Sequence, residues 1–216
     1  LPQLWDDNEY AVMCGGSMLY VDAVCKGIDQ MPTISTEVRE KVLRQYGECG
    51  IECIIAQLEL LDPDYLRIVD IKNEKRLLHA LEICLQAGVP YSSLRTGQVK
   101  PRPFRIVKIG LDMAREELFS RINRRVDAMI EAGLVEEARS VYEQRHLNSL
   151  NTVGFKELHA WMSGEMDFDT ARERIKKNTR VYAKRQLTWY RKDPAMTWLH
   201  PHDATPEAVK KLIAQG

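Results

Sequence analysis

The sequence predicts an α/β fold in which a small parallel sheet is joined to a mostly helical insert. Three observations predict it. Short apolar runs at 10–14, 104–111 and 196–199 end at turn residues and are too brief for helices, which is typical of strands. The first run is followed by Gly15-Gly16 and a helix start, the βα unit of nucleotide-binding folds. Over residues 37–61 and 73–87 the apolar spacing is helical.

The first βα unit combines an apolar run, two glycines and a serine. We interpret residues 10–14 (YAVMC) as a buried parallel strand, and Ser17 as the cap of the next helix, whose free N–H groups favour an anion. The sequence GGS does not match GxxxxGK[ST], and no Walker A sequence occurs in these residues. An ordinary tight turn between strand and helix explains the local pattern at least as well.

The insert is predicted to contain two main helices. Ser35 or Thr36 is expected to cap a helix over 37–61, which Gly47 and Gly50 should divide. A second helix, over 73–87, carries Lys75, Arg76 and His79 in its first turns and stops at Gly88. Cations there oppose the helix dipole, so either a function at that end or chance placed them.

The second half of the chain alternates strand and helix patterns. A helical region over 114–145 is divided by Gly133 and carries Arg121 and Arg125 one turn apart. These arginines either serve an anion or belong to a solvated surface with neighbouring carboxylates. Residues 167–169 are expected to cap a long helix, and Thr205-Pro206 opens a last helix over 207–214.

The most informative segment is the basic one from Arg172 to Lys192. It holds nine Lys or Arg and one Glu, a charge of +8, in a chain whose formal net charge is zero. On a helix, one side carries what we call the basic stripe, and apolar and aromatic residues lie opposite. Such a helix suits phosphate recognition, and a solvated amphipathic helix is the alternative. The basic stripe consists of Lys176, Lys177, Arg180, Lys184 and Arg191.

Length and composition limit the class of protein. With 216 residues, 44% hydrophobic and 29% charged, the chain is expected to form one globular domain, or one with an insert. Its neutrality excludes a general polycation, so any nucleic-acid site must be local. No apolar run approaches the ~20 residues that span a bilayer, and no targeting peptide is visible. We expect a cytoplasmic protein with buried, reduced cysteines. Because the sequence begins with Leu1 and not with Met, we also expect it to be a fragment or a processed product.

Five segments resemble, in their order and spacing, the tRNA dimethylallyltransferases, also called tRNA isopentenyltransferases. They are GGSMLY (15–20), NEKRLLHALEI (73–83), LFSRINRRVDAMIEAGLVEEA (118–138), TVGFKEL (152–158) and TRVYAKRQLTWYR (179–191). The resemblance implies transfer of a dimethylallyl group from dimethylallyl diphosphate to N6 of the adenosine 3′ of the anticodon, in tRNAs reading codons that begin with U. It also implies a P-loop NTPase-like parallel sheet, an insert that grips the anticodon stem-loop, Mg²⁺ as cofactor and a monomer without membrane attachment.

The resemblance also assigns residues. It divides the chain into a catalytic core, 1–30 with 99–216, and a tRNA-binding insert, 31–98. His79 stands where Arg is commoner, and Phe155 where Tyr is usual. The residues implied to bind tRNA are Ser17, Arg39, Lys75, Arg76, His79, Asn151, Thr152, Val153, Gly154, Phe155, Lys156, Lys184, Arg185, Gln186 and Arg191. For the diphosphate we choose, from charge and position, Arg121, Arg125 and Arg180.

The largest departure from the family pattern is an absence. The phosphate-binding loop (GPT-x-x-GK-T/S) and the Asp after it, which acts as the general base, do not occur in these residues. We therefore assign no catalytic residue and no metal ligand, and expect the fragment to be inactive alone. Two alternatives remain: a non-catalytic module that binds the anticodon arm, and a P-loop kinase relative. The helical insert and the KRQLTW run speak against a small-molecule kinase.

Overall fold

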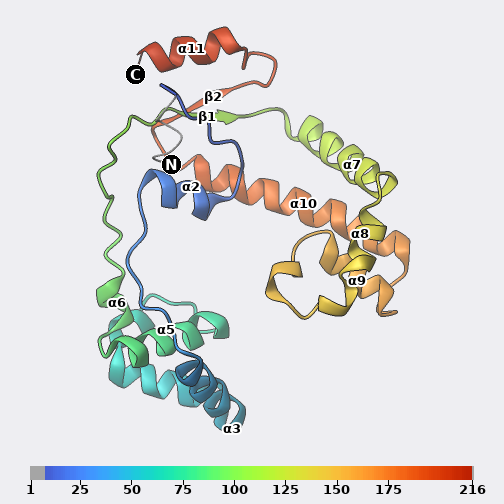
Figure 1. The fold of residues 1–216 in the computed structure, drawn as a ribbon. Coiled ribbons are helices and arrows are strands. Elements are labelled where there is room, and N and C mark those ends of the chain that lie inside the picture. The colour runs from blue at the N-terminus through green and yellow to red at the C-terminus, as the bar shows by residue number, and fades with distance from the viewer. Residues whose placement is uncertain (1–7, 216) are drawn as a thin grey trace. The chain divides into compact units, whose positions relative to one another are not determined.

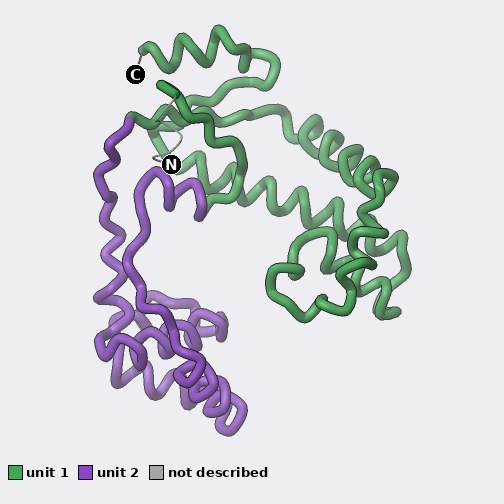
Figure 2. The backbone as a smooth tube through the Cα atoms, in the orientation of Figure 1, with its two compact units in different colours: residues 1–18, 105–216 green, residues 19–104 purple. Residues whose placement is uncertain are grey.

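The computed structural model describes residues 8–215 and divides into two compact units (Figure 2). Unit 1 comprises the chain up to Met18 together with Arg105 onward, and unit 2 comprises Leu19–Phe104. The predicted insert covers residues 31–98. Unit 2 extends beyond it at both ends, into the two segments that connect the units. The functional division into a catalytic core and a tRNA-binding insert stays a prediction.

Unit 2 is helical, and its capping residues explain where the helices begin and end. Ser35 begins the long helix, because its hydroxyl accepts a hydrogen bond from the Val38 N–H at 3.2 Å. The predicted division of this helix into two pieces is confirmed: it breaks at Gly50 (φ 75°), whereas Gly47 keeps a helical conformation. Gly88, in the left-handed conformation (φ 68°), ends the second main helix as predicted. The elements are α2 (Met18–Cys25), α3 (Thr36–Leu61), α4 (Pro63–Leu66), α5 (Glu74–Ala87) and α6 (Tyr91–Leu94).

The core of unit 2 lies between α3 and α5 (Figure 1). Asp62 is buried beside this core and joins the short helices. Its carboxylate accepts hydrogen bonds from the N–H groups of Tyr65, at 3.1 Å, and Ser92, at 2.7 Å. This contact fixes α4 relative to α6. The buried core residues are Val42, Ile54, Leu58, Tyr65, Leu77, Ala80, Leu81 and Cys84.

The cysteines differ from the expectation of buried, reduced thiols. Cys49 and Cys53 lie one helical turn apart in α3 and form a disulfide. Of the free cysteines, Cys84 is buried, whereas Cys14 is exposed and Cys25 is partly buried.

Unit 1 contains a two-stranded parallel sheet and a group of packed helices (Figure 1). Lys108 pairs with Met196, and the other strand residues follow in register. Trp198 lies against Gly110, where a Cβ would overlap the indole ring. The elements are β1 (Lys108–Leu111), α7 (Arg115–Glu131), α8 (Leu134–Ser140), two 3₁₀ turns (Tyr142–Gln144 and Asn148–Leu150), α9 (Phe155–Met162), α10 (Phe168–Tyr190), β2 (Met196–Leu199) and α11 (Pro206–Gln215).

The predicted strand over residues 10–14 is wrong. This segment has no regular secondary structure, and Val12 is 91% exposed. A strand requires a hydrogen-bonded neighbour, and in the described part of the chain only β1 and β2 pair. The predicted strand over 104–111 is confirmed for 108–111, and the one over 196–199 in full.

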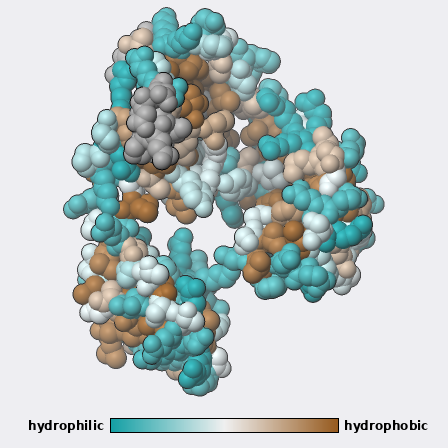
Figure 3. Space-filling view, in the orientation of Figure 1, coloured by the Kyte–Doolittle hydropathy of each residue, from teal (hydrophilic) through white to brown (hydrophobic). Residues whose placement is uncertain are grey.

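In unit 1, α10 packs against α7 and α9 (Figure 1). Asp167 begins α10, because its carboxylate accepts the Thr170 N–H at 2.7 Å, as predicted. Figure 3 shows hydrophobic residues at the surface close to the strand pair. The buried residues of the helical core are Val126, Leu134, Ala138, Leu158 and Ile175.

Candidate nucleic-acid interface

The glycine turn before α2 is in contact with α10. The side-chain amide of Gln186 donates a hydrogen bond from Nε2 to the carbonyl oxygen of Gly16, over 2.9 Å and 170 residues of sequence. A Cβ at Gly16 would overlap the Gln186 amide, so a larger residue there would displace this side chain. The partner that a half-buried amide needs is therefore a backbone carbonyl beside Ser17.

Three further predicted tRNA-binding residues are close in sequence to this contact and are exposed. Ser17 follows Gly16 directly, and Lys184 and Arg185 precede Gln186 on α10. Cations on a surface have the charge and freedom to meet an anion. The two cations therefore lie directly beside the residue of α10 that contacts the GGS turn.

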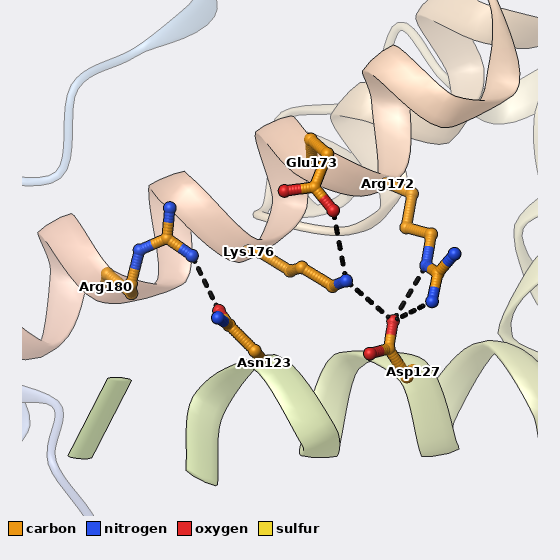
Figure 4. A network of polar contacts seen from close by, with 6 residues as sticks. All are labelled: Asn123, Asp127, Arg172, Glu173, Lys176 and Arg180. Atoms are coloured by element: carbon orange, nitrogen blue, oxygen red, sulfur yellow. Dashed lines mark hydrogen bonds and ion pairs between the residues drawn. The ribbon is translucent and has the colours of Figure 1, made fainter. Parts of the chain in front are cut away.

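The basic stripe is not one continuous exposed surface. Lys176 is only 8% exposed, and its ammonium contacts Asp127 at 2.9 Å and Glu173 at 3.0 Å (Figure 4). Arg172 approaches the same Asp127 carboxylate at 2.7 Å. The hydrogen bond from Lys176, followed by that from Arg172, lowers the pKa of Asp127. The predicted role of Lys176 in an anion-binding stripe is wrong, because its charge is neutralised where α10 packs on α7.

The three residues chosen for the diphosphate are not brought together as a set. Arg180 donates to the Asn123 side chain at 2.6 Å and lies 5.8 Å from the centroid of the Phe119 ring (Figure 4). Arg121 and Arg125 are exposed on α7. Each is two residues from Asn123, about 200° around the helix, so both face away from the side that meets Arg180.

Arg180 also borders an open hollow of about 500 Å³ on α10. Arg174 and Lys177 line it, and so do Asp169 and Glu173. The two carboxylates offset the cations and weaken the attraction for an anion. Diphosphate binding by Arg121, Arg125 and Arg180 stays a prediction.

The segment 151–156, predicted as a loop, is a loop up to Gly154 and continues as the first turn of α9; it is fixed at Gly154 and exposed at its other residues except Phe155. Glu157, 3% exposed, accepts hydrogen bonds from the Gly154 N–H at 2.8 Å and the Asn178 amide of α10 at 2.7 Å. Gly154 has a φ of 107°, which favours glycine. Exposed residues of this loop are Asn151, Thr152, Val153 and Lys156.

Phe155 and Arg191 are engaged within unit 1. The Phe155 ring stacks on His159, with 6.0 Å between centroids, and His159 Nε2 lies 3.0 Å from the Ala138 carbonyl. Arg191 forms an ion pair with Asp112 at 2.8 Å, which partly neutralises it at the end of α10. Both side chains therefore have structural contacts besides any contact with RNA.

In unit 2 a single carboxylate contacts two predicted tRNA-binding residues. Glu82 of α5 is buried, and its two oxygens lie 3.6 Å from Arg39 of α3 and 3.6 Å from His79 of α5. Their side chains are about half exposed, so their charged ends reach the surface. This buried acid orients both groups, and sequence reasoning missed it.

The remaining unit 2 candidates border a hollow of about 480 Å³. Lys75, Arg76 and His79, which lie close together on α5, line it with Arg95. Sequence reasoning also missed Arg95, Glu157 and Asn178. Of these, only Glu157 could have been found from the sequence, because it directly follows the predicted loop. Arg95 and Asn178 contact residues distant in the sequence, so no local pattern marks them.

These features define the class of protein. It is a mostly helical α/β protein with a small parallel sheet, whose exposed cations gather around aromatic residues and glycine turns in a pattern typical of polyanion binding. The model of the IPP transferase family matches residues 1–193, and the chain belongs to this family of transferases.

Two similar proteins carry names that agree with this family. The chain is 56% identical to "tRNA dimethylallyltransferase 1" of Bacteroides thetaiotaomicron over 216 residues, 100% of this chain and 70% of that protein. It is 54% identical to the enzyme of the same name from Bacteroides fragilis, covering 93% of this chain and 67% of that one.

The chain is also similar in fold to proteins whose structures have been solved. The tRNA isopentenylpyrophosphate transferase of Bacillus halodurans is 32% identical, with a TM-score of 0.52, over 91% of this chain and 61% of its own. A eukaryotic dimethylallyltransferase acting on tRNA has a TM-score of 0.70 at 23% identity, over 93% of this chain and 55% of its own, a likeness of fold. Among the described residues, no helix is both long and apolar enough to cross a membrane.

Proposed function

We propose that this chain provides the tRNA-facing part of an enzyme that transfers a dimethylallyl group from dimethylallyl diphosphate to tRNA. The target is N6 of the adenosine 3′ of the anticodon, in tRNAs reading codons that begin with U. The observation that carries the proposal is the hydrogen bond from Gln186 to Gly16, because it joins the KRQLTW segment to the GGS turn. Two motifs shared with the family are thus in contact.

In the proposed reaction, N6 attacks the allylic carbon. The carbon–oxygen bond to the diphosphate breaks, the diphosphate leaves with the bonding electron pair, and a base takes a proton from N6. Such a step requires cations or N–H groups positioned on the leaving group. We propose that the strand pair belongs to a P-loop NTPase-like sheet and that Arg180 lies toward the diphosphate. We assign no base within this chain.

These 216 residues contain no phosphate-binding loop, and we propose that they do not catalyse transfer alone. The family resemblance implies Mg²⁺, which would neutralise the leaving diphosphate. In the described part of the chain, no group of three or more His, Cys, Asp or Glu could hold a metal ion. We therefore assign no Mg²⁺ ligand within this chain. We further propose a cytoplasmic monomer.

The test uses the protein in its natural full length, dimethylallyl diphosphate labelled in the allyl group, and an anticodon stem-loop RNA. We expect label on an RNA with adenosine 3′ of the anticodon and none on an RNA with guanosine there. The 216-residue chain should bind the first RNA and transfer no label. Binding without transfer by the full-length protein would favour the non-catalytic anticodon-arm module instead, and absence of binding would overturn both.

A further inference from the structure

The hollow in unit 2 is lined by residues that no family motif indicated. Besides Lys75 and Arg76 of α5, Arg95 and two tyrosines, Tyr65 and Tyr91, border it. These three lie outside the segments that resemble the family, so their arrangement is an observation of the structure alone. Tyr65 belongs to α4, Tyr91 begins α6, and Arg95 directly follows α6.

Arg95 is oriented by the two aromatic rings. Its Cζ lies 5.6 Å from the centroid of Tyr65 and 5.5 Å from that of Tyr91, within the range of cation–π attraction. The rings meet edge to face, with 5.0 Å between centroids. An arginine held in this way loses less conformational freedom when it binds an anion than one that is free in solvent.

The tyrosines are themselves fixed. Tyr65 is 4% exposed and belongs to the core of unit 2. The buried carboxylate of Asp62 joins the backbones of α4 and α6, and the Tyr91 N–H donates to Cys84 Sγ at 3.3 Å. The aromatic support beneath Arg95 is therefore a rigid part of the unit.

The lining of the hollow is cationic. Lys75, Arg76 and Arg95 are basic side chains, His79 adds an imidazole ring, and no acidic side chain is among the residues that line it. Among the described residues, two carboxylates contact lining residues, and both are buried. Asp62 accepts the Tyr65 N–H at 3.1 Å, and Glu82 lies 3.6 Å from His79 and 3.6 Å from Arg39. The charge that faces the hollow is positive.

We propose that Arg95 binds one backbone phosphate of the RNA, and that Lys75 and Arg76 contact the phosphates beside it. A guanidinium donates two parallel hydrogen bonds to a phosphate, and lysine adds a compact charge. The inference rests on the proposed function, since it takes the anticodon arm of a tRNA as the ligand, and adds a phosphate contact outside the family motifs.

The test measures the Kd of the 216-residue chain for an anticodon stem-loop RNA between 50 and 200 mM salt. Removing one phosphate contact should lower the slope of log K against log salt by about one. Over this fourfold change in salt, the unchanged chain should lose about three- to fourfold more affinity than Arg95→Gln. Arg95→Lys, which keeps the charge, should retain most of the slope.

Two controls make the result decisive. Arg44→Gln removes an exposed arginine of α3 that does not line the hollow, and its slope should equal that of the unchanged chain. Tyr91→Phe keeps the ring and should bind like the unchanged chain. An unaltered slope in Arg95→Gln, while the unchanged chain binds RNA, overturns the phosphate site alone. Failure of the unchanged chain to bind RNA overturns this site and the proposed function together.

Discussion

The Gln186 amide lies 2.9 Å from the Gly16 carbonyl oxygen, and this hydrogen bond joins α10 to the turn that precedes α2. Both residues belong to unit 1. The bond sets the position of Ser17 relative to Lys184 and Arg185. The segment from Arg172 to Lys192, most of which lies in α10, carries +8 and acts on one substrate only if its exposed charges keep a fixed position relative to the other contacts.

The first prediction removes this hydrogen bond. Gln186→Ala should reduce the free energy of unfolding by about 1 kcal/mol and weaken RNA binding. Gly16→Ala should weaken RNA binding comparably, because its Cβ displaces the amide. The double variant should be no worse than either single variant, as expected for coupled residues. Urea unfolding and RNA titration measure this, with Gly47→Ala in α3, where a Cβ meets open space, as control. Additive losses would contradict the coupling.

The second prediction concerns the exposed cations of α10. Replacing Lys184 and Arg185 together by Ala should weaken binding of an anticodon stem-loop and lower its salt slope by roughly one to two. Replacing Lys210 and Lys211 of α11 by Ala removes the same charge from another exposed helix and should leave the slope unchanged. If both double variants lose the same slope, the effect is one of net charge and not of a site on α10.

The third prediction concerns the loop over 151–156. Glu157→Gln places an NH₂ group against either the Gly154 N–H or the Asn178 amide, so one of two hydrogen bonds is lost. We expect a destabilisation of about 1–3 kcal/mol and weaker RNA binding at a temperature where the variant is folded. Glu143→Gln, at an exposed carboxylate, is the control. Full stability with full binding would show that the buried acid does not orient the loop.

The fourth prediction is a pH dependence. The pKa of Asp127 is lowered in the folded state by Lys176 and Arg172, so below about pH 4 the unfolded chain binds more protons than the folded one at this group. Its stabilisation is complete above pH 4 and is lost as the pH falls through the lowered pKa. Asp127→Asn should cost about 1 kcal/mol at pH 7 and progressively less as the pH falls below about 4. Urea unfolding of both proteins across this range measures the difference.

The same variant tests the reassignment of Lys176. Because Lys176 contacts Asp127 and Glu173 within unit 1, Asp127→Asn should leave the salt slope of RNA binding unchanged. An increased slope would mean that Lys176 contributes to the RNA surface, either while it is paired with Asp127 or once that pair is removed.

Local signals in the sequence predicted much of the secondary structure. Ser35, Asp167 and Gly88 begin or end helices where expected, because capping depends on residues within one turn. The strand over 196–199 was also predicted correctly. The strand at 10–14 was not, because an apolar run becomes a strand only beside a partner that local sequence does not identify.

The candidate site was predictable as residue types and not as an arrangement. The sequence by itself determined the helix boundaries, the family and the excess of cations in α10. Only the tertiary structure decided which cations are free. It paired Lys176 with Asp127, joined Gln186 to Gly16 and placed Arg95 on two tyrosines. The physical reason is that charge and propensity belong to single residues and their near neighbours, whereas desolvation and ion pairing depend on segments that meet only when the chain is folded.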